Sequence, residues 1–261
     1  MRKRNAERAR MRGLLLFFIL AFALAIPFWL KAPPLVGFAP AIAALIVGGP
    51  MLLVRAFDVH RLRDHVLALL LLPPALFASG ALLMRFTAGT APEIEPNVLL
   101  LFPVFFALAL VQELGWTGYA LERFPNRWAG VSAGMVLAAV WSVWSLVPLM
   151  QAGRPAHWVF YIAIAMMIFR VLMVWLYQNA GRSVVGAALL HAAWDASILA
   201  FPTAEPAYLL PFLAGALTLA LLAQGPRLMP RSVKAHIPAH RGPARAPLRR
   251  ARNLDRAAHR G

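Results

Sequence analysis

Apolar runs long enough to cross a lipid bilayer follow one another along most of this chain. A membrane-spanning helix needs about 20 mainly apolar residues. The candidate spans are residues 13–30, 33–56, 65–85, 97–119, 128–150, 157–178, 182–200 and 206–225. Hydrophobic residues make up 61% of the 261 residues and charged residues only 14%, whereas soluble domains are about half apolar and about a quarter charged. The sequence therefore predicts an all-α, polytopic membrane protein with about eight transmembrane helices.

Positive charge gathers at the two ends of the chain. The formal net charge is +16, with 26 Lys and Arg against 10 Asp and Glu. Residues 1–12 hold six basic side chains and one acidic, and residues 226–261 hold ten and one. We therefore expect a basic N-terminal segment (1–12), a transmembrane domain (13–225) and a basic tail (226–261). The tail is rich in Pro, Ala, Arg and His, a composition typical of disorder.

The loop charges predict the orientation in the membrane. If the N-terminus is inside, the loops on the inner side carry Arg55, Arg61, Arg63, Arg123, Arg127 and Arg182. The outer loops then carry Lys31, Arg85 and Arg154 together with Glu93, Glu95 and Glu205. Basic residues favour the cytoplasmic side, so we expect a multi-pass protein of the cell (inner or plasma) membrane with both termini in the cytoplasm.

The expected partners follow from this charge pattern. The spans contact the lipid bilayer, and the basic tails attract anionic lipids. The tails contain few aromatic residues and no folded nucleic-acid reader, so nucleic acid is not an expected partner. The chain has no cysteine, which excludes disulfides and Cys-ligated zinc.

Only a few ionisable residues fall inside the spans, namely Glu113, Arg170, His191 and Asp195. Such residues are costly in hydrocarbon and usually face the interior of the bundle. His191 and Asp195 are four residues apart, so they share one helix face. From the residues alone, three interpretations stay open: structural pairing between helices, an ion or proton path, and a hydrolytic site.

Three short patterns, in order, resemble the motifs of a known family. They are Gln112-Glu113-Leu114-Gly115-Trp116-Thr117-Gly118, then Trp141 to Ser145, then His191 to Asp195. They are similar to E-E-x-x-x-R-G, F-x-x-x-H and H-x-x-x-N or H-x-x-x-D of the CPBP intramembrane protease family, which includes the CAAX prenyl endopeptidases and bacteriocin-immunity-type proteins. The resemblance covers about residues 97–200 and implies a CAAX-protease-like bundle of helices.

The resemblance also implies roles for single residues. In the family, the first glutamate and the second-motif histidine activate water, directly or through a metal. The third-motif His and Asn or Asp support the developing oxyanion, and the arginine orients the glutamates. Of the catalytic set this chain keeps Glu113, His191 and Asp195. The other three motif positions are substituted, by Gln112, Thr117 and Ser145.

These substitutions weaken the implied chemistry of a metallo- or glutamate-type endopeptidase. The Gln112 amide does not titrate, and losing one general base reduces a rate by about 10² to 10⁴. Ser145 cannot supply a nitrogen ligand to zinc, so the cofactor stays unassigned: zinc is possible for the family, but its ligand set is incomplete here. Glu113 lies roughly 100° around the helix from position 112, so a direct exchange of roles is doubtful. Ser145 as a nucleophile activated by His191 is a further alternative.

Depth along the helices adds a second obstacle. In straight helices Glu113 lies about 9 Å from the inner end of its span and Ser145 about 25 Å from the inner end of the next. The two meet only if the boundaries shift or the aromatic stretch 116–128 forms an interfacial or re-entrant segment.

The residue chemistry favours a non-catalytic family member that binds a membrane peptide or a partner protein. The alternative is a divergent intramembrane endopeptidase that cleaves near the cytoplasmic face, with Glu113 as base. An ion-coupled transporter ranks lower, because the spans show no paired inverted halves. Both leading hypotheses require the polar side chains in the spans to converge on one shared pocket.

Overall fold

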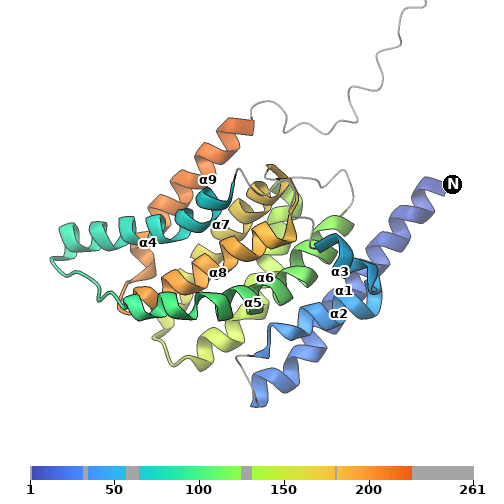
Figure 1. Ribbon diagram of the computed structural model, residues 1–261, viewed down its shortest axis with the longest axis horizontal. Coiled ribbons are helices and arrows are strands. Elements are labelled where there is room, and N and C mark those ends of the chain that lie inside the picture. The colour runs from blue at the N-terminus through green and yellow to red at the C-terminus, as the bar shows by residue number, and fades with distance from the viewer. Residues whose placement is uncertain (1, 32–34, 57–64, 125–130, 180, 225–261) are drawn as a thin grey trace, which may run out of the picture. The chain divides into compact units, whose positions relative to one another are not determined.

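Helices joined by short connections make up the described part of the protein (Figure 1). The structure is a computed structural model. It describes residues 2–31, 35–56, 65–124, 131–179 and 181–224, and all of them fall within one compact unit, Met1–Leu228. These ranges contain no β-strand, which confirms the all-α prediction. The predicted basic tail, 226–261, lies outside the described residues.

Each predicted span contains helix, although several boundaries differ. The helices are α1 (Arg2–Lys31), α2 (Phe38–Gly48), α3 (Met51–Ala56), α4 (Val66–Ala88), a 3-10 helix (Pro96–Leu101), α5 (Phe102–Glu113), a π-helix (Leu114–Leu121), α6 (Val131–Gln151), α7 (Ala156–Asn179), α8 (Val184–Ala200), a second 3-10 helix (Pro206–Leu209) and α9 (Leu210–Gln224). The basic segment 1–12 is not separate in structure, since α1 already begins at Arg2.

Six helices of the described part are long and apolar enough to cross a membrane, rather than eight. They are Asn5–Lys31, Val66–Ala88, Pro96–Leu121, Val131–Gln151, Ala156–Asn179 and Pro206–Ala223. The two remaining apolar helices, α2 and α8, are shorter, with 11 and 17 residues. The predicted span 33–56 is divided because Gly49 ends α2 with a positive φ of 77°, and the following Pro50 has no backbone N–H to continue the helix.

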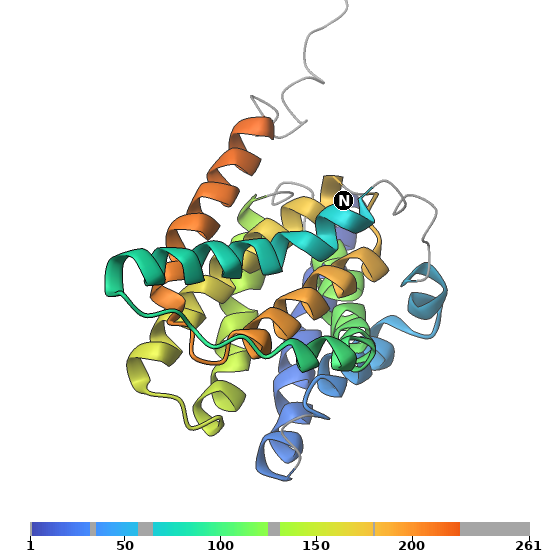
Figure 2. The ribbon, with the colours of Figure 1, turned by 60° about the vertical axis from the view of Figure 1, so that its left-hand side comes forward.

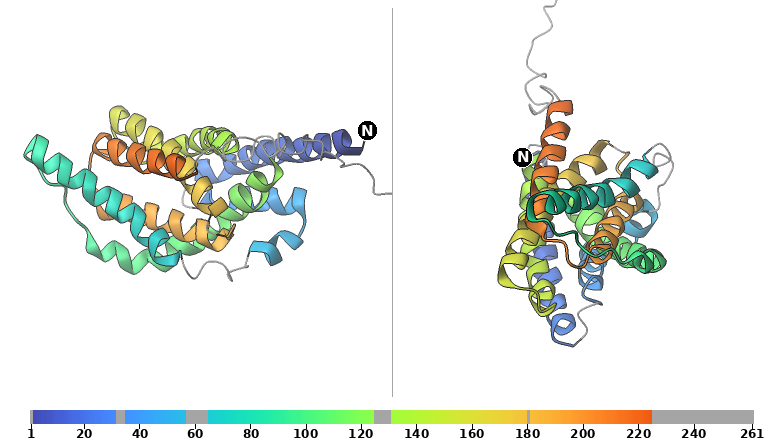
Figure 3. Two further views of the ribbon diagram at one scale, coloured as in Figure 1. Left: turned by 90° about the horizontal axis from the view of Figure 1, so that it is seen from above. Right: turned by 90° about the vertical axis from the view of Figure 1, so that its left-hand side faces the viewer.

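The helix α8 lies among three other helices. It packs against α4, α5 and α7, and Figure 3 shows it running beside both α4 and α5. Most of its side chains are buried, and it begins at the N-cap Ser183, whose hydroxyl accepts a hydrogen bond from the backbone N–H of Gly186. A helix covered on so many sides needs no lipid-facing stripe.

The outer helices instead present apolar side chains away from the protein. Leu71 of α4 is 60% exposed, and Leu219 of α9 is 69% exposed. On α1, which packs along α2 (Figure 2), Ile19 is 65% exposed. Contiguous exposed apolar surface is rare on soluble proteins but is the expected surface of helices in lipid. The fold thus supports the prediction of a polytopic membrane protein.

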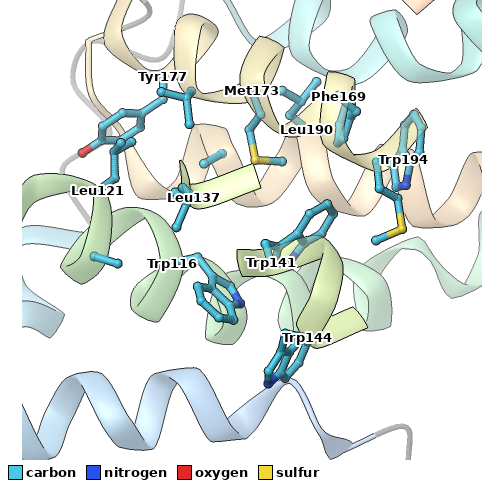
Figure 4. Close-up of a cluster of buried hydrophobic side chains, with 14 of the residues drawn as sticks. Trp116, Leu121, Leu137, Trp141, Trp144, Phe169, Met173, Tyr177, Leu190 and Trp194 are labelled. Atoms are coloured by element: carbon cyan, nitrogen blue, oxygen red, sulfur yellow. The ribbon is translucent and has the colours of Figure 1, made fainter. Parts of the chain in front are cut away.

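Tryptophan side chains dominate the core between α6, α7, α8 and the π-helix (Figure 4). The ring of Trp194 stacks on Phe169, with centroids 4.1 Å apart and an interplanar angle of 16°. Trp116 meets Trp144 edge to face at 5.6 Å. Aromatic pairs in these geometries contribute about 0.5–1.5 kcal/mol beyond their buried area, so this core fixes the relative rotation of the helices that carry the polar residues.

The stretch that follows Glu113 is a buried π-helix, Leu114–Leu121, and residues 125–128 of the aromatic stretch lie outside the described residues. Trp116, Tyr119 and Phe124 are all at most 6% exposed. The π-helix crosses α2 closely at Gly115, where a Cβ atom would lie 2.5 Å from the carbonyl oxygen of Pro40. Such π segments in a helix often occur at functional sites, and this one begins directly after the intramembrane glutamate.

Candidate functional site

Three helical elements bring the intramembrane ionisable residues together. Glu113 is the last residue of α5, Arg170 lies in α7, and His191 and Asp195 lie in α8. Glu113 and Arg170 are completely buried and His191 is 2% exposed. The three residues predicted as site residues, Glu113, His191 and Asp195, therefore lie close together in the fold.

The carboxylate of Glu113 is the centre of this cluster. Its Oε1 accepts a hydrogen bond from Nη1 of Arg170 at 2.6 Å. The same oxygen lies 2.8 Å from Nδ1 of His191. Its other oxygen, Oε2, accepts a hydrogen bond from the hydroxyl of Thr117, which itself accepts one from Nη2 of Arg170 at 3.3 Å. Every oxygen of the buried carboxylate thus has a partner within the protein.

His191 lies between the buried Glu113 carboxylate and the partly exposed Asp195. Its Nδ1 faces Glu113, and its Nε2 lies 3.7 Å from Oδ2 of Asp195, too far for a good hydrogen bond. The Asp195 side chain is 35% exposed, whereas that of His191 is 3% exposed. Trp141 closes another side of the cluster: its ring meets His191 edge to face at 5.4 Å, and the Arg170 guanidinium lies 5.1 Å from the ring centroid.

The side chains at the three substituted motif positions lie in different places. Thr117 belongs to the cluster through Glu113. Gln112 points to another side and packs against α2, where a Cβ added to Gly37 would lie 2.9 Å from the Gln112 Cγ. The hydroxyl of Ser145 donates to the carbonyl of Trp141 at 2.9 Å, and in the described residues it makes no hydrogen bond to His191 or Glu113. Among the described residues, neither Gln112 nor Ser145 makes a hydrogen bond to Glu113.

Arg170 is the site residue that the motif comparison missed. It lies between the second and third motifs, on a helix that carries neither. The signal was nonetheless present, because it is the basic residue predicted inside a span and Glu113 is a carboxylate inside another. With Thr117 at the arginine position of the first motif, Arg170 brings a guanidinium to the same carboxylate from a different helix.

The residues present do not suit a metal ion. A divalent cation needs carboxylate oxygens or imidazole nitrogens with free lone pairs. Here the Arg170 guanidinium lies 2.6 Å from Glu113 Oε1 and repels a second positive charge at that oxygen. Among the described residues no group of three His, Cys, Asp or Glu side chains could hold a metal ion.

A pocket lies elsewhere in this part of the protein. It is formed between α4, α7, α8 and the 3-10 helix Pro206–Leu209, with mainly apolar side chains such as Phe77, Met84 and Trp158 in its lining. None of the cluster residues lines it. The polar side chains therefore converge as expected, but they pair with one another rather than surround that pocket.

The fold and the cluster together define a class of protein, a polytopic helical membrane protein with a buried Glu–Arg–His cluster between its helices. Within it, residues 94–197 match the family model described as "Type II CAAX prenyl endopeptidase Rce1-like", so this segment is a domain of the Rce1-like CAAX protease family. The matched segment contains all three motifs and also Arg170, which lies between the second and the third, and the match confirms the resemblance seen in the sequence. The chain matches none of the curated proteins.

Proposed function

We propose that this protein is a non-catalytic Rce1-like membrane protein that binds a membrane peptide or a partner protein. The observation that carries the proposal is that both oxygens of the Glu113 carboxylate are engaged within the protein, by Arg170, His191 and Thr117. A general base must accept a proton from water through a free lone pair within about 2.6–3.2 Å. A carboxylate held by a guanidinium and two further donors is a weak proton acceptor.

The remaining candidates for water or nucleophile activation are also committed to other contacts. Ser145 donates its proton to the backbone of its own helix, and Gln112 packs toward α2. A cluster of this kind orients α5, α7 and α8 relative to one another. The cluster thus preserves the arrangement of the helices but leaves few side chains free to activate water for hydrolysis.

A peptidase assay tests the proposal. The protein is reconstituted in liposomes with a library of membrane-proximal peptides, and we expect no turnover above that of the Glu113→Gln variant. The gain-of-function variant combines Gln112→Glu, Thr117→Arg and Ser145→His with Arg170→Leu, so that one guanidinium remains beside the carboxylates. We expect cleavage only in this variant, and a further His191→Ala change should abolish it. Efficient cleavage by the unmodified chain would overturn the proposal.

A divergent endopeptidase is the second candidate, because one specific observation favours it. Asp195 is partly exposed and lies beside His191, so a substrate could approach the cluster from that side and meet an imidazole. This hypothesis predicts turnover by the unmodified chain that vanishes in both Glu113→Gln and His191→Ala. Equal signal from the unmodified chain and both variants would exclude it.

We further propose that the protein resides in the cell membrane with both termini cytoplasmic and with anionic lipids at its basic ends. The basic residues of α1 and of the inner loops support this orientation. The chain has no cysteine, so single-cysteine labelling has no background. We expect Thr90→Cys to react with an impermeant maleimide in intact cells and Asn5→Cys to react only after permeabilisation. The reverse pattern would contradict the orientation.

A further inference from the structure

A half-buried arginine follows the π-helix at the end of the span Pro96–Leu121. The guanidinium of Arg123 lies over the ring of Tyr119, with Cζ 4.2 Å from the ring centroid. Its Nη1 donates a hydrogen bond to the Tyr119 hydroxyl at 3.1 Å. Tyr119 itself is 1% exposed. The core therefore holds the guanidinium in one position, whereas most membrane-edge arginines extend freely.

Two glycines shape the place where Arg123 lies. A Cβ atom at Gly13 of α1 would lie 3.0 Å from the Tyr119 hydroxyl and 3.6 Å from Nη1 of Arg123. A Cβ at Gly48, the last residue of α2, would lie 2.7 Å from the Tyr119 ring. Any larger side chain at either position would displace the tyrosine. The guanidinium thus lies where α1, at Gly13, and the last residue of α2, Gly48, approach the π-helix.

No carboxylate of the described residues lies within ion-pair distance of Arg123. Arg170 has Glu113 at 2.6 Å, and Arg182 has Glu122 at 2.8 Å. For Arg123 the contacts are those to Tyr119, and its Nη2 and Nε groups make no hydrogen bond to a described residue. Among the described residues the guanidinium thus has no counter-ion, and holding a charge partly out of water in that way is unfavourable. An anion from outside the chain would stabilise this arrangement.

The neighbouring charges also favour an anion. Gly13 directly follows Arg12 and lies one turn after Arg10, and both side chains are exposed on α1. The acidic residue on this part of α1 is Glu7, six residues before Gly13 and therefore about 9 Å away along the helix axis. Glu122, the carboxylate next to Arg123 in sequence, is engaged by Arg182 and Tyr177.

We propose that Arg123, with the basic turn of α1, binds the phosphate group of an anionic membrane lipid. Arginine binds phosphate through two parallel N–H donors, and two sets of N–H groups of Arg123 remain available. Arg123 lies two residues beyond Leu121, the last residue of a candidate span, and the end of a spanning helix is expected to reach the headgroup region. A lipid headgroup is therefore a better source of phosphate here than a dissolved anion. The site rests on the proposed placement of anionic lipids at the basic ends of the protein, but not on whether the protein hydrolyses peptides.

The experiment compares two variants that lose the same charge. Purified full-length protein in a neutral detergent is titrated with short-chain phosphatidylglycerol, and thermal unfolding is followed by tryptophan fluorescence. The test variant is Arg123→Gln, and the matched control is Arg85→Gln, which alters an exposed arginine in the last turn of α4. Separate arms use phosphatidylcholine and inorganic phosphate. The basic tail is present in every variant, so its contribution is shared.

We expect phosphatidylglycerol to stabilise the unmodified protein and Arg85→Gln equally. Arg123→Gln should need about tenfold more lipid for the same stabilisation, because a charge-assisted hydrogen bond is lost. An equal response of Arg123→Gln and the unmodified protein would overturn the proposal. Stabilisation of the same size by inorganic phosphate alone would overturn the lipid assignment.

A second variant keeps the test valid if Arg123→Gln does not fold. Arg12→Glu changes an exposed residue and places a carboxylate beside the site, so the fold should tolerate it. We expect about threefold weaker binding of phosphatidylglycerol, in line with an exposed pair of charges. The same lipid dependence as the unmodified protein would argue against an anion site at this position.

Discussion

Glu113 and Glu122 are two carboxylates on one continuous helical stretch, and each binds an arginine and a hydroxyl group. The Glu113 pair is buried in the protein, whereas the Glu122 pair is partly exposed. The Glu113 carboxylate binds the guanidinium of Arg170 and the hydroxyl of Thr117, and the side chains of Glu113 and Arg170 are both completely buried. Glu122 binds Arg182 through both oxygens, at 2.8 and 2.9 Å, and accepts a hydrogen bond from the Tyr177 hydroxyl at 2.9 Å.

Burial, rather than the type of partner, separates these two clusters. The side chains of Arg182 and Glu122 are 59% and 37% exposed, so water and salt screen their attraction, and such pairs contribute about 0–1 kcal/mol. The Glu113–Arg170 pair has no water to replace a lost partner. Breaking a buried pair of this kind costs about 3–5 kcal/mol, because the remaining charge stays buried and unpaired.

The exposed pair is present at every physiological pH. Partial burial lowers the pKa of the Arg182 guanidinium, but the Glu122 carboxylate more than offsets burial, so the pKa is raised. When folding raises the pKa of a basic group, the protonated group stabilises the folded state at every pH below the pKa that the group has in the unfolded state. Since an arginine guanidinium stays protonated throughout the physiological pH range in both states, this contribution should not change between pH 5 and 9.

The largest predicted effect in this comparison is that of Arg170→Leu. It leaves the Glu113 carboxylate buried without its guanidinium, and we expect a loss of about 3–5 kcal/mol in the free energy of unfolding. Denaturant unfolding in mixed micelles, followed by tryptophan fluorescence, measures it. Arg182→Leu is the matched control and should lose no more than about 1 kcal/mol. Equal losses in the two variants would mean that burial does not separate the clusters.

Replacing both members of the buried pair should restore most of the free energy of unfolding that Arg170→Leu loses. The double variant Glu113→Leu/Arg170→Leu leaves no buried charge of the pair, and apolar replacement of buried ion pairs is often neutral or stabilising. We expect a coupling free energy of about 2–3 kcal/mol in the double-mutant cycle. Additive losses from the two single variants would show that the two side chains act independently.

A guanidinium supplied from position 117 should partly replace Arg170. In Thr117→Arg/Arg170→Leu the new arginine starts one turn from Glu113, on the same helical stretch. We expect it to regain about 1–3 kcal/mol over Arg170→Leu, the range of a hydrogen bond to a charged group. Thr117→Lys/Arg170→Leu is the control, because lysine offers charge without the planar fork of donors. No recovery in either variant would mean that only α7 can present this charge.

The smallest effect is expected at the exposed cluster. Glu122→Gln should change the free energy of unfolding by at most about 1 kcal/mol, and 1 M salt should remove the difference because the Debye length is then about 3 Å. The same salt titration should leave the Arg170→Leu effect nearly unchanged. A loss at Glu122 that persists in high salt would indicate a structural role beyond the ion pair.

Much of the fold could be predicted, and the site only in part. The apolar runs predicted the all-helical fold correctly, with six rather than eight helices long enough to span a membrane among the described residues, and the motif order pointed to Glu113, His191 and Asp195, which lie close together. The two divided or shortened spans were missed, because a break at Gly49 and Pro50 leaves hydropathy nearly unchanged. The π-helix was also missed, since its sequence is mainly apolar like its surroundings and apolar runs do not distinguish an α-helix from a π-helix.

The sequence by itself determined that this protein is a helical bundle in lipid with very few intramembrane charges, because hydrocarbon tolerates long helices and excludes almost every ionised side chain. Only the tertiary structure decided which of those charges meet. The rotation and depth of α5, α7 and α8, set by tryptophan packing, direct Arg170 to Glu113 and turn Gln112 and Ser145 away from it. Pairing depends on contacts of a few ångströms between separate helices, and no spacing along one helix specifies them.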